Sequence, residues 1–301
     1  MSPLIVGGRT IYGSLSSYPT GITTSVGSEY YDTTLDKKRV YKSTGWVELS
    51  DTTISGSNIG EATGTVMYFD FGNYSASSWQ GNTGATTLTN IQSSGASGGV
   101  NLPKGNASYN ATNGGILRGS STQDVRTTVS GSNPFGQTLS MGIVVRFDSG
   151  SDNAGSPSRG LLYYGNTGGD QHFYVRKNFG TANNISVGQD TNGSDVWTQV
   201  ATGYTSSNGF TVFIFNLASD GTLSTSINGG AFTTNRSGGG AISVSGPGIG
   251  FFGDPYNDNS SSFDIGAGFW RTQLTTDQES ADWYTYLKSD YGAGSNRFSL
   301  T

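Results

Sequence analysis

Paired carboxylates are the first residues in this sequence that could do chemistry. Enzymes that cleave glycosidic bonds commonly use two carboxyl groups, one as the acid and one as the nucleophile or base. The chain has four glutamates, at Glu29, Glu48, Glu61 and Glu279. The pattern places them in a short meander, a linker and a helix start, and none in the main run of strands. An aspartate pair, Asp148 with Asp152, is explained more simply by a turn rich in Asp, Ser and Gly. The sequence therefore predicts a protein that is not an enzyme.

Histidine chemistry has little material in this chain. His172, in "GDQHFYVRK", is the only histidine, and cysteine is absent. A zinc site needs several Cys or His ligands, so a histidine-based zinc centre is excluded by number. His172 could partner a serine and Asp170 in nucleophilic catalysis. The alternation of the segment instead predicts that His172 simply occupies one face of a strand.

Calcium is the metal ion that the sequence could hold, because calcium needs only oxygen ligands. The stretch "GDPYNDNSS" at 253–261 supplies Asp254, Asn257, Asp258 and Asn259 within a few positions. The alternative is an Asx-rich turn without any metal. No cofactor is required by either interpretation, and calcium is the ion that this loop would take.

Exposed aromatic rings are the usual platform for sugars, together with amide and carboxylate groups. Several aromatic residues fall in predicted loops or at strand ends. The candidates for a glycan site are Trp79, Tyr109, Tyr163, Tyr164, Trp197, Tyr204 and Tyr256. Each of them also has the alternative of packing in the core or at its rim. Trp270 and Trp79 occupy places where a β-sandwich tends to use core aromatics.

The composition places these residues in an all-β protein. The chain has 301 residues, of which 47 are glycine, and its aromatic content of 12% is enough to build a core. Short apolar runs separated by Gly, Ser and Thr are typical of strands and turns. The net charge of −5 disfavours a nucleic-acid-coating protein. The longest apolar stretch, residues 210–218, is too short to span a bilayer, and no secretion signal is expected at the N-terminus.

The region from 65 to 292 carries the pattern of a two-sheet sandwich. At least eight strand-like runs follow one another between Thr65 and Arg271, which predicts two packed sheets. On alternation, Ile143 and Val145 oppose Val144 and Phe147, and Ile265, Ala267 and Phe269 share one face. These two assignments are expectations about which side chains enter the core.

One helix is predicted at 275–292. Thr276 and Glu279 have the spacing of a capping box, and Gly292 is a C-terminal stop. Trp283, Leu287 and Tyr291 lie at helical spacing, which predicts an apolar stripe that packs on a sheet. We expect residues 293–301 to form a C-terminal tail.

The N-terminal part predicts a small separate module. Residues 1–26 are expected to form an extended arm, with a frayed terminus as the alternative. Residues 27–50 predict a β-meander with strands at 29–33, 39–41 and 46–49, and 51–64 a polar linker. A meander of this size needs a neighbour or further copies of itself. The residues expected to mediate oligomerisation or anchoring are Tyr30, Tyr31, Val40, Tyr41, Trp46 and Val47.

Two resemblances follow from these stretches. "EYYDTTLDKKRVYKSTGWVEL" resembles a small module that recurs in bacteriophage virion proteins. "YFDFGNYSASSW", "ATTLTNIQSSGASGGVNLP" and "YNATNGGILRG" are similar to the opening of concanavalin A-like, laminin-G-like jelly rolls. "FDIGAGFWRTQLTTDQESADWYTYLKSDYG" is similar to the last strand and helix of that fold, whereas residues 190–245 depart from it.

Together the resemblances imply a structural virion protein. We expect an outward-facing capsid decoration or short fibre, made in the host cytoplasm and displayed on the virion surface. It would be anchored by its N-terminal segment as a homotrimer, with other capsid or tail proteins as partners and host surface polysaccharide as a further contact. No nucleic-acid partner and no membrane insertion are expected. The alternatives are a tail-fibre receptor-binding lectin and, less favoured, a polysaccharide-degrading enzyme.

Overall fold

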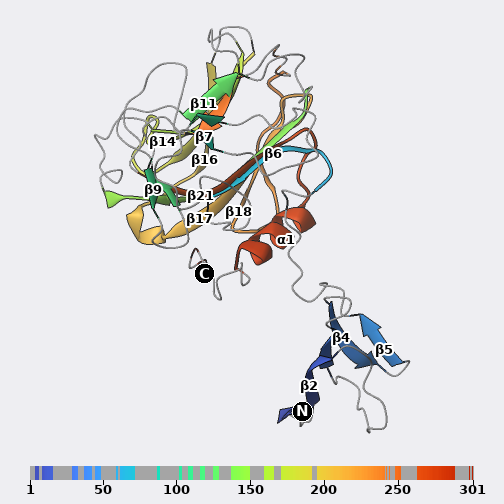
Figure 1. Ribbon diagram of the computed structural model, residues 1–301. Helices are drawn as coiled ribbons and strands as arrows, with labels where there is room; N and C mark the ends of the chain where they lie inside the picture. The colour runs from blue at the N-terminus through green and yellow to red at the C-terminus, as the bar shows by residue number, and fades with distance from the viewer. Residues whose placement is uncertain are drawn as a thin grey trace. The chain divides into compact units, whose positions relative to one another are not determined.

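The structure is a computed structural model in which the chain divides into two compact units, Met1–Ser55 and Gly56–Thr301 (Figure 1). In the first unit it describes the backbone of five strands. In the second unit it describes the strands and helix named below, the connections within 62–71, 137–149, 171–191, 195–240 and 263–288, and residues 59, 242, 244, 298 and 300. Each unit is considered by itself.

The N-terminal unit is one small sheet with strands in chain order. Its strands are β1 (Leu4–Val6), β2 (Arg9–Leu15), β3 (Glu29–Asp32), β4 (Lys37–Lys42) and β5 (Gly45–Glu48). Strands β3 to β5 form the antiparallel meander that the sequence predicts. The first 26 residues carry two more strands, since β1 pairs with β2 and β2 runs parallel to β3.

The second unit is a β-sandwich of two antiparallel sheets. The larger sheet has the order β19-β18-β17-β12-β21-β10-β9, with β6 also paired to β21, and the smaller one has the order β11-β20-β13-β14-β15-β16. The larger sheet comprises β6 (Thr65–Asp70), β9 (Ser108–Asn110), β10 (Ile116–Arg118), β12 (Leu139–Phe147), β17 (Phe210–Leu217), β18 (Leu223–Ile227), β19 (Thr233–Arg236) and β21 (Phe263–Arg271). The smaller sheet comprises β11 (Val125–Thr128), β13 (Arg159–Gly165), β14 (His172–Lys177), β15 (Ile185–Asp190), β16 (Asp195–Ala201) and β20 (Gly248–Phe251). The unit also contains a short pair, β7 (Thr87–Leu88) with β8 (Leu102–Pro103), and a 3-10 turn, Ser206–Asn208. The predicted all-β class with a sandwich is confirmed.

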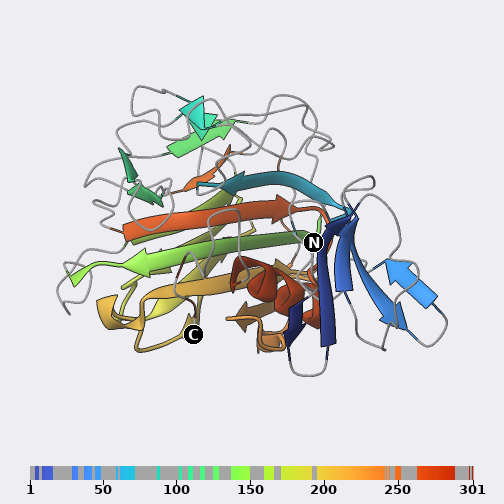
Figure 2. The same cartoon turned by 60° about the horizontal axis from the view of Figure 1, so that its bottom comes forward.

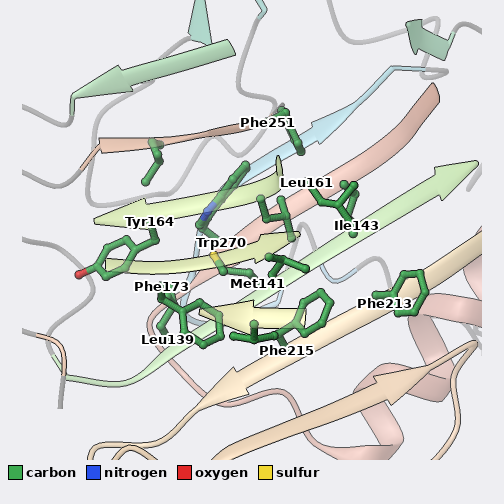
Figure 3. Packing of buried hydrophobic residues seen from close by; sticks show 14 of the residues in the cluster. Leu139, Met141, Ile143, Leu161, Tyr164, Phe173, Phe213, Phe215, Phe251 and Trp270 are labelled. Carbon is green, nitrogen blue, oxygen red and sulfur yellow. The ribbon is translucent and has the colours of Figure 1, made fainter. Parts of the chain in front are cut away.

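The main core lies between the two sheets. Its centre is aromatic: Trp270 packs edge-on against Phe251 with ring centroids 5.0 Å apart, and against Phe69 at 6.1 Å (Figure 3). The Trp270 indole Nε1 donates a hydrogen bond to the Tyr163 carbonyl oxygen at 3.3 Å, which links the two sheets across the core. Trp270 is fully buried, as the sequence predicts.

A second apolar cluster covers the outer face of the larger sheet. The helix α1 (Asp277–Lys288) lies across this sheet and buries Trp283 and Leu287 (Figure 2). Ile59, Phe298 and Leu300 join the same cluster. The sandwich therefore draws core residues from the predicted linker and from the predicted tail, beyond the expected bounds of 65–292.

The capping box at the start of α1 is confirmed. The Glu279 amide donates to the Thr276 hydroxyl oxygen at 3.2 Å, and the Thr276 amide donates to the Glu279 carboxylate at 2.8 Å. These bonds satisfy two of the backbone donors that a helix start leaves unpaired. The predicted stripe is confirmed at Trp283 and Leu287, whereas Tyr291 and Gly292 lie outside the described residues. No helix in the described part of the chain has the length and apolar character needed to cross a membrane.

The predicted shared face of Ile265, Ala267 and Phe269 is wrong. Val144 lies opposite Ala267, but Val145 lies opposite Ile265, so Gly266 is an extra residue in β21. Such a β-bulge shifts the alternation. Ile265 consequently enters the main core, whereas Ala267 and Phe269 face α1.

The assignment of Phe147 is also corrected. Phe147 lies in the main core with Ile143 and Val145, on the face opposite Val144, because alternate residues of a strand share a face.

Candidate functional site: the outer face of the smaller sheet

Polar and aromatic side chains collect on the outer face of the smaller sheet. Residues directly opposite each other in antiparallel strands share a face. The register aligns Tyr163, Tyr174, Gly188 and Trp197 in one row across β13 to β16. The next row holds Arg176, Ser186 and Gln199. Valines and leucines of the same strands enter the main core, so these two rows lie on the side away from it.

Trp197 is the centre of the aromatic contacts on this face. Its ring stacks on Phe179 with centroids 3.6 Å apart and planes 20° from parallel. Tyr174 meets the same indole edge-on at 4.7 Å and 88°. Gly188 leaves the room for this meeting, because a Cβ there would lie 2.9 Å from the Tyr174 ring and 3.0 Å from the Trp197 ring. Trp197 and Phe179 are half-buried, whereas Tyr174 is fully buried.

Arg176 supports the ring cluster with a cation. Its guanidinium carbon lies 4.7 Å from the Tyr174 ring centroid, 5.2 Å from that of Trp197 and 5.5 Å from that of Phe179. A cation at such distances from aromatic rings is attracted by their quadrupoles. Arg176 is 3% exposed, so it acts as a buried brace of the rings rather than as a surface charge.

The turn between β14 and β15 places Phe179 beside Trp197. Asn178 and Asn183 both adopt positive φ angles, 64° and 58°, which asparagine tolerates better than most residues. The Asn183 amide donates to the Asn178 side-chain oxygen at 2.7 Å, and the Asn178 amide donates to the Asn184 carbonyl at 3.0 Å. Hydrogen bonds within the turn therefore fix its shape, and this shape determines where Phe179 lies.

Amide side chains complete the site. The Asn184 Nδ2 group donates to the Phe179 carbonyl oxygen, to the Ser186 hydroxyl and to Gln199 Oε1. Asn184 is buried and Gln199 is exposed. We name the group of Arg176, Phe179, Asn184, Trp197 and Gln199 the Trp197 patch. Rings and amides of this kind are suited to contact a sugar.

Of the predicted glycan candidates, the structure brings Trp197 into this patch. Tyr204 is half-buried elsewhere, edge-on to Phe213 at 5.0 Å, where it packs against the main core. Burial raises the pKa of the Tyr204 hydroxyl above its ordinary value. Tyr204 thus packs against the main core, and part of its ring stays exposed.

The expectation for Tyr163 and Tyr164 requires correction. Their side chains are 0% and 1% exposed, so neither presents a ring on which a sugar could stack. Tyr164 belongs to the main core (Figure 3), and Tyr163 lies buried in the outer-face row next to Tyr174. A local pattern of two adjacent tyrosines does not reveal that both faces of β13 are covered.

Several other predictions fall on residues that the structure does not describe. These are the aromatic candidates Trp79 and Tyr256, the calcium candidates Asp254, Asn257 and Asp258, and the side chain of Tyr109 in β9. Among the residues that are described, no three His, Cys, Asp or Glu side chains are grouped as a metal site would need. Calcium binding at 253–261 stays a prediction.

Two further candidates for chemistry, Glu279 and His172, make structural contacts. Glu279 caps α1 and forms an ion pair with Arg271 at 2.8 Å. Burial alone would raise the pKa of Glu279, but the hydrogen bonds and charge of Arg271, with the bonds from Thr276, hold it below its ordinary value. His172 is fully buried and lies 4.4 Å from the Tyr174 ring.

In the N-terminal unit the backbone register sorts the predicted oligomerisation residues into opposite pairs. Tyr41 lies opposite Trp46, and Val40 lies opposite Val47. The two tyrosines of β3 lie opposite basic residues of β4, Tyr30 opposite Arg39 and Tyr31 opposite Lys38. Since neighbours along a strand alternate, these candidates divide between the two faces of the small sheet.

Comparison with known proteins gives a fold but no family. No protein-family model matches the chain, and no curated protein matches it. Solved structures do match. The binding domain of botulinum neurotoxin DC in complex with SialylT has a TM-score of 0.55 at 12% identity, over 74% of this chain and 51% of that chain.

Two further structures agree with this match. A structure of botulinum neurotoxin type C, described as dependent for cell entry on interaction with two ganglioside molecules, has a TM-score of 0.53 at 13% identity, over 77% of this chain and 53% of that chain. The binding domain of Paraclostridial Mosquitocidal Protein 1 has a TM-score of 0.52 at 12% identity, over 75% and 53%. This chain spans about half the length of these neighbours. It therefore shares the lectin-like β-sandwich fold found in receptor-binding domains.

Proposed function

We propose that this chain is a non-enzymatic binding protein whose sandwich recognises a surface glycan at the Trp197 patch. The observation that carries the proposal is the unequal use of the two outer faces. The larger sheet has an apolar outer face that α1 covers, whereas the smaller sheet carries rings, amides and a cation on its outer face. A polar outer face is common in a sandwich, so the feature that favours glycan binding is the half-buried Phe179–Trp197 pair beside the exposed amide of Gln199.

A binding role also agrees with the neighbours of the fold. They are receptor-binding domains, one in complex with SialylT and one described as interacting with gangliosides. Glu279 is engaged by the helix cap and by Arg271. These observations favour recognition over hydrolysis.

The finer proposal is that the protein is a component of a bacteriophage virion, displayed on its surface as a capsid decoration or short fibre. The resemblance of residues 29–49 to a recurrent virion module supports this context. A sheet as small as β1 to β5 gains stability from partners, which supports attachment to capsid or tail proteins and a homotrimer. A tail-fibre receptor-binding lectin is the second candidate, favoured by the receptor-binding neighbours.

The glycan proposal is tested with the full-length protein on a panel of bacterial surface polysaccharides and defined oligosaccharides. We expect wild-type protein to bind at least one glycan and Trp197→Ala to lose that binding. A Val196→Ala variant is the control, because Val196 is exposed on the same strand and lies one residue from the ring. Absence of binding to every glycan by the wild type contradicts the proposal, as does equal binding by Trp197→Ala.

The virion proposal is tested separately by cryo-electron microscopy of intact particles. Density for this chain on the capsid lattice, anchored by residues 1–49, supports a decoration. Density at the tail tip with the sandwich outward supports the receptor-binding lectin. Absence of the chain from purified particles contradicts both assignments.

A further inference from the structure

Asn184 holds an unusual position beneath the Trp197 patch. Its side chain is 2% exposed, and its Nδ2 group donates to three oxygens at 2.9 Å, 3.1 Å and 3.2 Å. The other end of the same amide, Oδ1, is buried and has no hydrogen-bond partner among the described residues. Leaving a buried acceptor unpaired costs about 1–3 kcal/mol. A buried water molecule at this oxygen removes that cost.

Gln199 is oriented by the same contacts. Because its Oε1 accepts from Asn184 Nδ2, the Nε2 group of this planar amide lies on the other side. Gln199 is exposed, so Nε2 is accessible as a donor. Asn184 thus orients the Gln199 amide so that Nε2 is the donor left for a ligand.

The stacked rings border this donor. Phe179 is tied to Asn184 through its carbonyl oxygen, and Trp197 lies two residues before Gln199 on the same face of β16. Both rings are half-buried and face-to-face at 3.6 Å. The C–H face of a sugar packs on such a ring, while its hydroxyl groups bond to nearby polar groups.

We infer that the Trp197 patch is a subsite for a neutral saccharide. One of its hydroxyl groups accepts a hydrogen bond from Gln199 Nε2, which Asn184 holds in place from below, while the sugar ring lies against the Phe179–Trp197 pair. This inference rests on the proposed glycan-binding function and specifies its ligand. The sugar is neutral because the polar contact at the surface is an uncharged amide and Arg176 is packed under the rings.

The test uses Gln199→Glu in the full-length protein. A glutamate keeps an oxygen for Asn184 and the shape of the side chain, but replaces the outward donor by an acceptor. Gln137→Glu is the matched control, because Gln137 is exposed in front of β12, on the other sheet, and the change adds the same charge. Both variants and the wild type are titrated with neutral gluco-, manno- and galacto-oligosaccharides and with acidic ones, namely sialyllactose and oligoglucuronate.

We expect the wild type and Gln137→Glu to bind a neutral oligosaccharide equally, and Gln199→Glu to bind it about tenfold more weakly, the loss for one hydrogen bond and an unpaired group. If Trp197→Ala loses binding but Gln199→Glu does not, the glycan site stands and the inference is wrong. If the wild type binds acidic oligosaccharides alone, the neutral subsite is also wrong. If it binds no glycan, both the inference and the proposed function are overturned.

Discussion

The two outer faces of the sandwich are built from the same alternation of residues but put to different uses. On the larger sheet, alternate residues such as Val144 and Phe269 are apolar and lie under α1. On the smaller sheet, the corresponding positions are Tyr174, Arg176 and Trp197. The comparison teaches that one face is closed by α1, while the other buries Tyr174 and Arg176 beneath the half-buried Phe179–Trp197 pair, on which the proposed glycan site depends.

The largest expected difference comes from the same substitution made on each face. Trp283→Ala removes a fully buried indole between α1 and Phe269, whose ring lies 5.0 Å away. We expect it to lower the free energy of unfolding by about 3–5 kcal/mol. Trp197→Ala removes a half-buried ring and should cost on the order of 1 kcal/mol. Chemical denaturation of both variants measures the pair.

Glycan affinity should rank the two variants in the opposite order to stability. Trp197→Ala should abolish binding although most molecules stay folded, whereas Trp283→Ala should bind normally in whatever fraction is folded. Equal losses of stability for the two variants, or intact binding by Trp197→Ala, would show that the two faces do not differ in role.

A second pair compares glycines on the two faces. Gly266→Ala puts a Cβ 2.3 Å from the buried Phe298 ring, and we expect a loss of about 1–3 kcal/mol from overpacking. Gly188→Ala puts a Cβ 2.9 Å from the ring of Tyr174 and 3.0 Å from that of Trp197, and Trp197 can turn toward solvent because it lies half-buried on an edge strand. The second change should therefore reduce glycan affinity more than stability. Thermal denaturation and glycan titration of both variants separate the two effects. A larger loss of stability for Gly188→Ala than for Gly266→Ala would contradict this prediction.

The smallest expected effect is a pH dependence on the helix-covered face. The folded-state pKa of Glu279 lies below its ordinary value of 4.5, so its ionisation stabilises the fold above that pH. This contribution is lost as the pH falls through the folded-state pKa. Glu279→Gln should be less stable than wild type at neutral pH, and the difference should disappear in acid. Denaturation midpoints across this range measure it, with glycan binding at neutral pH unchanged. A difference that grows in acid would be the wrong sign.

Local patterns predicted those parts of the fold that short segments determine. The helix could be predicted because Thr276 and Glu279 interact within one turn. The meander could be predicted because its strands are joined by short polar turns. The face of Ala267 was not readable, since the bulge at Gly266 exists only in the pairing with β12. Phe298 and Leu300 were missed because a polar tail gives no sign that its apolar residues close a distant cluster.

The candidate site was predictable in one residue of five. Trp197 stood out as an aromatic residue near a strand end, but its partners come from β14, the following turn and β16. Only the register brings Arg176 and Gln199 into one row. The alternation of "HFYVRK" with the Asn-rich turn that follows was the available signal, and it indicated a strand without indicating a site.

Hydrogen exchange of the full-length protein tests the contrast between the two faces most directly. It is measured with and without the oligosaccharide that binds most strongly. The account predicts slower exchange in the 179–189 and 195–201 segments on binding, with exchange in 277–288 unchanged. Protection confined to α1 or to residues 29–48, with none in β15 or β16, would contradict the assignment of the ligand to the outer face of the smaller sheet.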